Sequence, residues 1–132
     1  MSVAYLDLSD YLAIAAAITG FDTDTLIKVT DIGLADSALH APRAGFGDRE
    51  FYADFIDKSA VLLVRLVRNH PLPDGNKRAA WVSLRVFVEL NAWEWRPQPT
   101  VDEAQQAVLA VAAGEWDESH TAAWLHGHLV AD

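Results

Sequence analysis

The sequence predicts an all-α fold in a single domain, residues 1–132. The length suits one compact domain, and 52% apolar with 22% charged residues is the balance of a globular protein. Two long segments, residues 51–69 and 76–90, carry apolar residues at helical spacing on nearly every side, which is typical of helices buried all round. No segment shows sustained strand-like alternation between turn residues. We therefore expect about six helices around these two central ones.

The N-terminal third is expected to supply two helices. Ser9 can cap a helix over residues 10–19, and Gly20 can end it. A shorter helix is predicted to begin after Thr30 or Asp31, both of which are suitable cap residues.

A short loop is expected to join the two central helices. Pro71 disfavours helical geometry at His70, so the helix over residues 51–69 should end there. The next helix is predicted over residues 76–90. Residues 41–47, before the first central helix, are predicted to form a loop because of their proline and glycines.

The remaining elements follow the second central helix, apart from one candidate strand near the start. Thr100 is expected to cap a helix over residues 101–113, and residues 117–128 are expected to form the last helix. Strand signals are thin: residues 3–8 are a candidate edge strand, and residues 93–95 a candidate for brief pairing.

Composition excludes several classes of protein. The chain has no cysteine, which rules out disulfides and thiolate chemistry. Its longest apolar run, residues 11–18, is far shorter than the roughly 20 residues of a membrane-spanning helix. No basic residue precedes Lys28, so no signal peptide is expected, and we predict a soluble, cytoplasmic protein without membrane contact. The net charge of −9 argues against direct binding of nucleic acid.

The basic residues are concentrated in the middle of the chain. Between residues 58 and 89 lie one acid, Asp74, and five of the ten basic residues: Arg65, Arg68, Lys77, Arg78 and Arg85. Such an island in an acidic protein indicates either a local anion site or long basic side chains that extend from buried helices to solvent.

The loop between the central helices, His70-Pro-Leu-Pro-Asp-Gly-Asn-Lys-Arg78, carries the residues with the most chemistry. Asp74 or Asn76 can cap the helix that follows, and Gly75 allows close backbone approach. Lys77 and Arg78 fall in its first turn, where cations oppose the helix dipole. Two cations at this position are best explained by an anion bound from outside, such as a phosphate.

Two further side chains of this loop suit group transfer from a nucleotide. Asp74 beside a polyanion is a natural ligand for Mg²⁺. The neutral imidazole of His70 can take a proton from a hydroxyl near pH 7, although a histidine before proline is more often an ordinary helix terminus.

These nine residues resemble the motif of the Fic/Doc family, His-Pro-Phe-x-Asp/Glu-Gly-Asn-Gly/Lys-Arg. His70, Pro71, Asp74, Gly75, Asn76, Lys77 and Arg78 match it at the same spacing. Leu72 departs from the usual Phe and is expected to anchor the loop in the core with a smaller side chain. The likeness extends over residues 30–125, and the short chain is similar to the death-on-curing (Doc) branch.

The resemblance implies a role for each motif residue. His70 would be the base for an acceptor hydroxyl, and Asp74 would hold magnesium. Gly75, Asn76, Lys77, Arg78 and the helix amides would bind the phosphates of ATP. Arg68 is a second-rank candidate for a phosphate contact, with a structural role as the alternative.

Lys77 is the residue that favours one reaction over another. Most Fic proteins have Gly there and transfer AMP, whereas the Doc branch has Lys and is implied to transfer the γ-phosphate. The family's Doc toxin phosphorylates a threonine of elongation factor Tu, which stops translation, and its antitoxin partner Phd neutralises it. The resemblance thus implies a kinase-type toxin with ATP and Mg²⁺ as cofactors and a Phd-like antitoxin as partner. Two alternatives remain: an AMP transferase, and an inactive antitoxin-binding module in transcriptional control.

The sequence has four further features that bear on regulation, binding and packing. No Ser or Thr is followed four residues later by Glu, so the self-inhibitory motif of some Fic proteins is absent and inhibition is expected from another chain. Residues 42–49 are a candidate flap for a target segment. His120, His126 and His128 offer a less favoured metal site. Five tryptophans favour core packing, with a possible antitoxin contact at Trp93 and Trp95 as the alternative.

Overall fold

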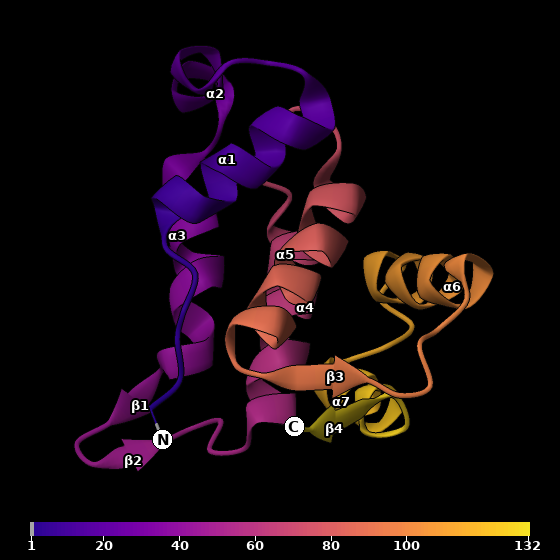
Figure 1. The fold of residues 1–132 in the computed structure, drawn as a ribbon. Helices are drawn as coiled ribbons and strands as arrows, with labels where there is room; N and C mark the ends of the chain where they lie inside the picture. The colour runs from indigo at the N-terminus through magenta and orange to yellow at the C-terminus, as the bar shows by residue number, and fades with distance from the viewer. Residues whose placement is uncertain (1) are drawn as a thin grey trace.

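The structure is a computed structural model and describes residues 2–132. Within that range the chain forms seven α-helices, one 3₁₀ helix and two small antiparallel strand pairs, which confirms the predicted all-α class (Figure 1). In chain order the elements are α1 (Leu8–Thr19), α2 (Thr23–Val29), α3 (Ile32–His40), η1 (Ala41–Arg43), β1 (Gly45–Phe46), β2 (Arg49–Glu50), α4 (Phe55–Asn69), α5 (Asn76–Leu90), β3 (Trp93–Trp95), α6 (Val101–Ala112), α7 (Glu118–His126) and β4 (Leu129–Ala131).

Helices α4 and α5 are central, as predicted. Helix α4 packs against α3, α5, α6 and α7, so apolar residues on all of its sides are covered. Leu63, Leu66 and Leu84 are completely buried at these contacts. Each buried leucine contributes roughly 1.5–3 kcal/mol to folding, so α4 and α5 form a rigid platform for the loop between them.

Side-chain caps set the starts of five helices, α1, α2, α3, α6 and α7. Helix α1 is capped by Asp7, whose carboxylate accepts from the Asp10 N–H while Asp10 accepts from the Asp7 N–H. The prediction of Ser9 as the cap was therefore wrong, because this reciprocal pair begins the helix at Leu8. Gly20 ends α1 in the left-handed region with φ of 81°, as expected.

Helices α2 and α3 follow α1. The sequence analysis did not predict α2, a helix of seven residues that Asp22 caps. Asp31 caps α3 through the Leu34 N–H at 3.1 Å, one of the two alternatives foreseen.

The segment before α4 differs from prediction. Residues 51–54 are not helical: Phe51 donates its N–H to Ala44 O at 3.0 Å, and Asp54 is the N-cap of α4. Residues 41–47 contain η1 and strand β1, which pairs with β2 in the register Gly45 with Glu50 and Phe46 with Arg49. The candidate flap is thus a β-hairpin.

Of the two candidate strands, one forms. Residues 3–8 form no strand, since the Ala4 backbone bonds to the side chain of Asn91 at 2.8 and 2.9 Å instead of to a neighbouring strand. Residues 93–95 form β3 and pair with β4 at the end of the chain.

The last two predicted helices are present as α6 and α7. Thr100 caps α6 in a capping box with Glu103, and Asp117 caps α7. Across residues 2–132 no helix combines the length and the hydropathy that crossing a membrane requires.

Candidate active site

His70 ends α4 in a strained backbone conformation. Its φ of 51° and ψ of 54° lie in the left-handed region, where residues other than glycine pay roughly 1–2 kcal/mol. The residue is exposed. The turn at His70 therefore starts the loop and leaves its imidazole accessible to a substrate.

The loop after His70 is fastened to the core and to α3. Leu72 is 2% exposed, so the smaller side chain anchors the loop as expected. The Asp31 N–H donates to Pro71 O at 2.8 Å, and Asn69 Nδ2 donates to Leu34 O at 3.0 Å. These contacts fix both ends of the turn that carries His70.

Asn76 holds the loop closed from within. Its Oδ1 accepts from the Leu72 N–H at 2.9 Å, and its Nδ2 donates to Leu72 O at 2.8 Å. The side chain is buried, with the whole residue 4% exposed. Asn76 therefore determines the loop's shape, and its contact with a phosphate stays a prediction.

Gly75 is the N-cap of α5, with φ of 78°. A Cβ atom here would lie 3.3 Å from Ile18 Cγ2 and 3.5 Å from Thr19 Cγ2. The positive φ favours glycine, and the close approach to the end of α1 leaves little room for a side chain. Because no side chain caps α5, the expected capping by Asp74 or Asn76 was wrong.

The first turn of α5 has the electrostatic character of an anion site. It contains no acid, and Lys77 and Arg78 are both exposed there. The amides of this turn have no capping side chain, and the dipole places positive potential at the same point. An anion at this position would satisfy the amides and offset the repulsion that the two cations experience.

Asp74 is exposed in the loop just before this turn. Among residues 2–132 no group of three or more His, Asp or Glu side chains could enclose a metal ion. The residues therefore fit Mg²⁺ held by one carboxylate together with phosphate oxygens, and not a cage built from the protein alone. The binding of magnesium by Asp74 stays a prediction.

The alternative metal site at the C-terminal histidines has no such cluster in the described part of the chain. The His120 ring stacks on Trp116 with centroids 4.6 Å apart, and His128 Nδ1 donates to Pro97 O at 2.7 Å. These histidines have structural contacts instead.

Arg68 ties the end of α4 to the connection between α6 and α7. Its Nη2 donates to Trp116 O at 2.6 Å, and its Nε lies 3.5 Å from Val111 O. These contacts match the structural role proposed as an alternative. A phosphate contact by Arg68 stays a prediction.

The tryptophans pack against the core, as the packing interpretation expected. Trp81 lies 5.3 Å from Trp95 and 6.2 Å from Trp124 between ring centroids, and Trp93 stacks on Phe55 at 4.9 Å.

A cleft of about 490 Å³ between α5 and α6 begins at the motif and was not predicted from the sequence. Its lining side chains come from the end of α1, from one face of α5, and from α6 with the segment before it: Ile18, Lys77, Arg78, Trp81, Val82, Arg85, Gln98, Pro99, Thr100, Val101, Ala104, Gln105, Val108 and Leu109. The sequence contains no local signal for it, because the two walls are far apart along the chain.

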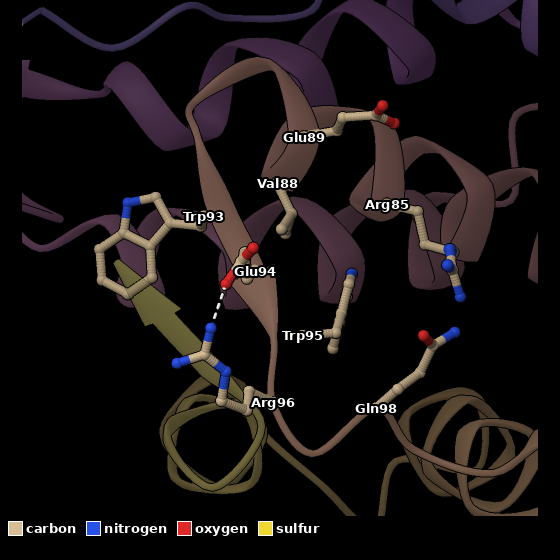
Figure 2. Close-up of a pocket in the computed structure, with 8 residues that line it drawn as sticks. All are labelled: Arg85, Val88, Glu89, Trp93, Glu94, Trp95, Arg96 and Gln98. Carbon is tan, nitrogen blue, oxygen red and sulfur yellow. Dashed lines mark hydrogen bonds and ion pairs between the residues drawn. The ribbon is translucent and has the colours of Figure 1, made fainter. Parts of the chain in front are cut away.

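A second cavity of about 480 Å³ lies farther along α5, between its C-terminal half and β3 (Figure 2). It shares Arg85 and Gln98 with the cleft, and Figure 2 shows these two side chains facing each other. With its amide oxygen turned toward the guanidinium, Gln98 accepts from both Arg85 Nη atoms at 3.2 Å. Both side chains therefore line the two cavities.

Comparison with known proteins agrees with this geometry. A family model described as "Fic/DOC family" matches residues 5–88, which include α4, the loop and most of α5. The chain therefore belongs to the Fic/DOC family. It is 36% identical over 127 residues to "Toxin Doc" of Mycolicibacterium smegmatis (strain ATCC 700084 / mc(2)155), an alignment that covers 96% of this chain and 95% of the relative.

Proposed function

We propose that this protein is a Doc-like toxin that transfers the γ-phosphate of ATP to a threonine or serine hydroxyl of a protein. The observation that carries the proposal is the uncapped first turn of α5, with Lys77 and Arg78, directly after the loop that carries His70. Similarity to a protein named Toxin Doc over nearly the whole chain supports the toxin role. Elongation factor Tu is the substrate we expect, and arrest of translation the effect.

The reaction is a phosphoryl transfer in line with the acceptor. The hydroxyl oxygen forms a bond to the γ-phosphorus while the bond from that phosphorus to the β–γ bridging oxygen breaks, and ADP leaves with this oxygen. His70 takes the proton of the hydroxyl through its imidazole. Arg78, Lys77 and the amides of α5 hold the phosphates and balance the charge that builds on them.

Magnesium bound at Asp74 would supply charge neutralisation at the phosphates. The protein's own contribution is positioning: the Leu72–Asn76 hydrogen bonds and the left-handed turn at Gly75 hold His70 and the first turn of α5 in one geometry.

Lys77 favours phosphoryl transfer over transfer of AMP. Its exposed side chain lines the cleft at the motif, where a glycine would leave space and bring no charge. A phosphate chain that crosses Lys77 is therefore held differently from one that lies over a glycine.

The proposed partner of the toxin is a Phd-like antitoxin that restrains it in the cell. The basis is the similarity to a protein named Toxin Doc, together with the Phd-like antitoxin that the resemblance to the Doc branch implies. The test of this partnership is whether co-expression of a neighbouring gene product abolishes growth arrest.

The decisive experiment compares ATP labelled on the γ-phosphate with ATP labelled on the α-phosphate, each incubated with bacterial lysate, Mg²⁺ and the protein. We expect label in a lysate protein from the γ position alone, and none with His70→Ala. His40→Ala is the matched control. His40 is also exposed, but its ring interacts with Asp36 within helix α3 and not with the motif loop.

Label from the α position would replace the kinase with an AMP transferase. Absence of label from both positions, in lysate and with purified elongation factor Tu, would favour an inactive antitoxin-binding module.

A further inference from the structure

Strand β3 pairs with β4 along one edge, and its other edge is open. The Arg96 N–H donates to His128 O at 2.7 Å. Because hydrogen-bonded residues alternate in an antiparallel pair, Glu94 also turns its backbone groups toward β4. Trp93 and Trp95 turn theirs to the opposite edge. Within residues 2–132, the backbone N–H and C=O groups of these two tryptophans have no hydrogen-bond partner.

The cavity of about 480 Å³ lies along this open edge, with α5 as its other wall. Figure 2 shows Arg85 and Gln98 on the side of β3 away from β4. The Trp95 ring lies 5.3 Å from that of Trp81 between centroids, which brings this end of β3 beside the turn of α5 that carries Arg85. A cavity of this volume is in the range that accepts a ligand. The open backbone groups therefore border on free space.

Arg85 brings a positive charge to the cavity that no acid of the chain pairs with. Its side chain is half-buried, and its partner is the neutral amide of Gln98 at 3.2 Å. None of the ion pairs within residues 2–132 includes Arg85. The other cation of the cavity, Arg96, is already paired with Glu94. Since a guanidinium binds a carboxylate more strongly than an amide, the cavity is complementary to an acidic group.

We infer that the open edge of β3 binds an extended segment of a partner protein, which adds an antiparallel strand and places an acidic side chain against Arg85. The backbone of the segment would bond to the free groups of Trp93 and Trp95, a common mode of peptide recognition. A residue opposite Trp95 has its side chain on the same face as Trp95, which is the face that packs on α5. The inference goes beyond the proposed function, because it holds for any reaction at the motif.

Glu89 determines where the acid of the segment lies. It is exposed one turn beyond Arg85 and lines the end of the cavity next to Trp93. A second acid in the segment would be repelled at that end. The complementary segment therefore has one acidic side chain, at the Trp95 end, and a neutral one at the Trp93 end.

A second copy of this chain is the other occupant to consider. Pairing of two β3 edges through Trp93 and Trp95 would place Glu94 directly opposite Glu94 of the other copy. Like charges in that position are destabilising, and each copy carries a net charge of −9. A short strand with a charged residue is one way in which proteins prevent self-association at an edge. The edge is therefore better suited to a different protein.

The probe is a blocked seven-residue peptide in which Thr alternates with Val, Asp and Val, so that one face carries a single carboxylate between two apolar side chains. The full chain is titrated with it, and amide hydrogen exchange is followed by NMR. With the peptide at about ten times its dissociation constant, exchange at Trp93 and Trp95 should slow about tenfold. The amide of Glu94 faces β4 and is the internal control, which should not change.

Two changes to the peptide test the backbone contact and the charge separately. In the antiparallel arrangement the residue that faces Arg85 also turns its N–H toward β3, so N-methylation of the Asp amide should abolish binding. N-methylation of the next Thr amide, which points away from β3, should leave binding intact. Replacement of the Asp by Asn should weaken binding about tenfold.

Arg85→Gln should weaken the Asp peptide to the same extent and leave the Asn peptide unaffected. Arg96→Gln is the matched control, because Arg96 lines the same cavity but is paired with Glu94, and it should alter neither affinity by more than about twofold.

Three results would overturn the inference. The first is that the peptide does not bind the natural chain, or binds without slower exchange at Trp93 and Trp95. The second is that the two N-methylated peptides bind equally well. The third is slow exchange at these two amides without peptide that becomes slower with protein concentration, which would assign the edge to a second copy of the chain.

Discussion

Lys58 Nζ lies 2.9 Å from Glu50 Oε1, and this ion pair joins the centre of the molecule to its hairpin. The Lys58 side chain is 2% exposed, whereas that of Glu50 is 51% exposed. The same ammonium donates to Pro42 O at 3.0 Å and lies 5.6 Å from the Tyr5 ring centroid. Burial opposes its charge, but hydrogen bonds to Glu50 and Tyr5 raise the pKa of Lys58 above its ordinary value, so it stays protonated.

Removal of the Glu50 charge should loosen the hairpin. Glu50→Gln leaves a buried ammonium with weaker partners, so we expect a loss of about 1–3 kcal/mol in the free energy of unfolding. The amide hydrogen of Phe51, which bonds to Ala44 O, should exchange faster. Denaturant unfolding and hydrogen exchange measure the two effects.

Glu94→Gln is the control for this change, because the Glu94–Arg96 pair is exposed on both sides. We expect Glu94→Gln to lower the free energy of unfolding by about 0–1 kcal/mol. Equal losses in the free energy of unfolding for Glu50→Gln and Glu94→Gln would show that burial of Lys58 does not strengthen its ion pair with Glu50.

Alanine at position 75 should destabilise the protein more than alanine at position 114, where the glycine has nearly the same backbone conformation. Gly114 has φ of 77°, close to the 78° of Gly75, but a Cβ there would meet nothing within 4 Å. Gly114→Ala should therefore cost only the backbone strain, roughly 1–2 kcal/mol. Gly75→Ala should cost more, because its Cβ would lie 3.3 Å from Ile18 Cγ2.

Thermal unfolding of the two variants gives the comparison. Ile18→Ala in the Gly75→Ala background should recover part of the added loss, since it removes the atom in conflict. No recovery would show that the contact with α1 is not the cause.

Asn76 and Asn91 form a natural comparison, since each side chain pairs with the N–H and C=O of one residue. Asn76 pairs with buried Leu72, and Asn91 with exposed Ala4. Asn76→Ala leaves two buried backbone groups without partners and should cost about 2–4 kcal/mol. Asn91→Ala should lower the free energy of unfolding less through the loss of this pair, because water takes the place of the Asn91 side-chain amide at the exposed Ala4 backbone.

Chemical denaturation of both variants measures this difference. Asn76→Ala should also weaken tripolyphosphate binding, since the loop before α5 loses its closure. An Asn76→Ala variant that is as stable as Asn91→Ala and binds tripolyphosphate as the natural chain does would contradict the role given to Asn76.

Tyr11 gives a prediction about pH. Its side chain is completely buried, and its hydroxyl has no hydrogen-bond partner. Burial raises the pKa of Tyr11 above its ordinary value of 10.0. The folded chain thus keeps this proton where the unfolded chain loses it, so stability should fall as the pH rises above about 10.

Tyr11→Phe should reduce this alkaline loss, and at pH 7 it should leave stability unchanged or raise it by about 1 kcal/mol. Tyr52→Phe should instead lower stability at pH 7, because the Tyr52 hydroxyl donates to Glu118 at 3.0 Å. Unfolding curves at pH 7 and pH 11 test both statements. A Tyr11→Phe variant that loses as much stability at pH 11 as the natural chain would contradict the first statement, and a Tyr52→Phe variant of unchanged stability at pH 7 would contradict the second.

The sequence allowed the main helices to be predicted because their signals are local. Thr100 and Glu103 form a capping box that is visible as a spacing, and α5 begins and ends at the predicted residues. Overlapping local signals caused the error at α1, where both Asp7 and Ser9 are good caps and the Asp10 side chain decides between them. Helix α2 buries only Leu26, so its apolar face is too small to predict.

Long-range contacts account for the other differences. Residues 3–8 have apolar residues suited to a strand, but the partner of Ala4 is an amide side chain 87 residues away. Strand β4 lies just after α7, and its pairing with β3 joins two segments whose register no local signal gives.

The candidate site also has a part that local sequence signals reveal and a part that depends on long-range contacts. Its nine motif residues are contiguous, so the resemblance that implies their roles is visible in the sequence itself. The wall that α6 adds to the cleft, and the bond from Arg68 to Trp116 O, depend on how distant helices pack.

The left-handed backbone at His70 has a consequence for how a loss-of-function variant should be chosen. Glycine adopts φ of 51° without the penalty that a side chain brings, so a chain selected for folding alone would place glycine here. His70→Gly should therefore remove the proposed activity while it raises the melting temperature. Such an inactive but more stable protein would separate the toxicity of the proposed reaction from any harm done by misfolding.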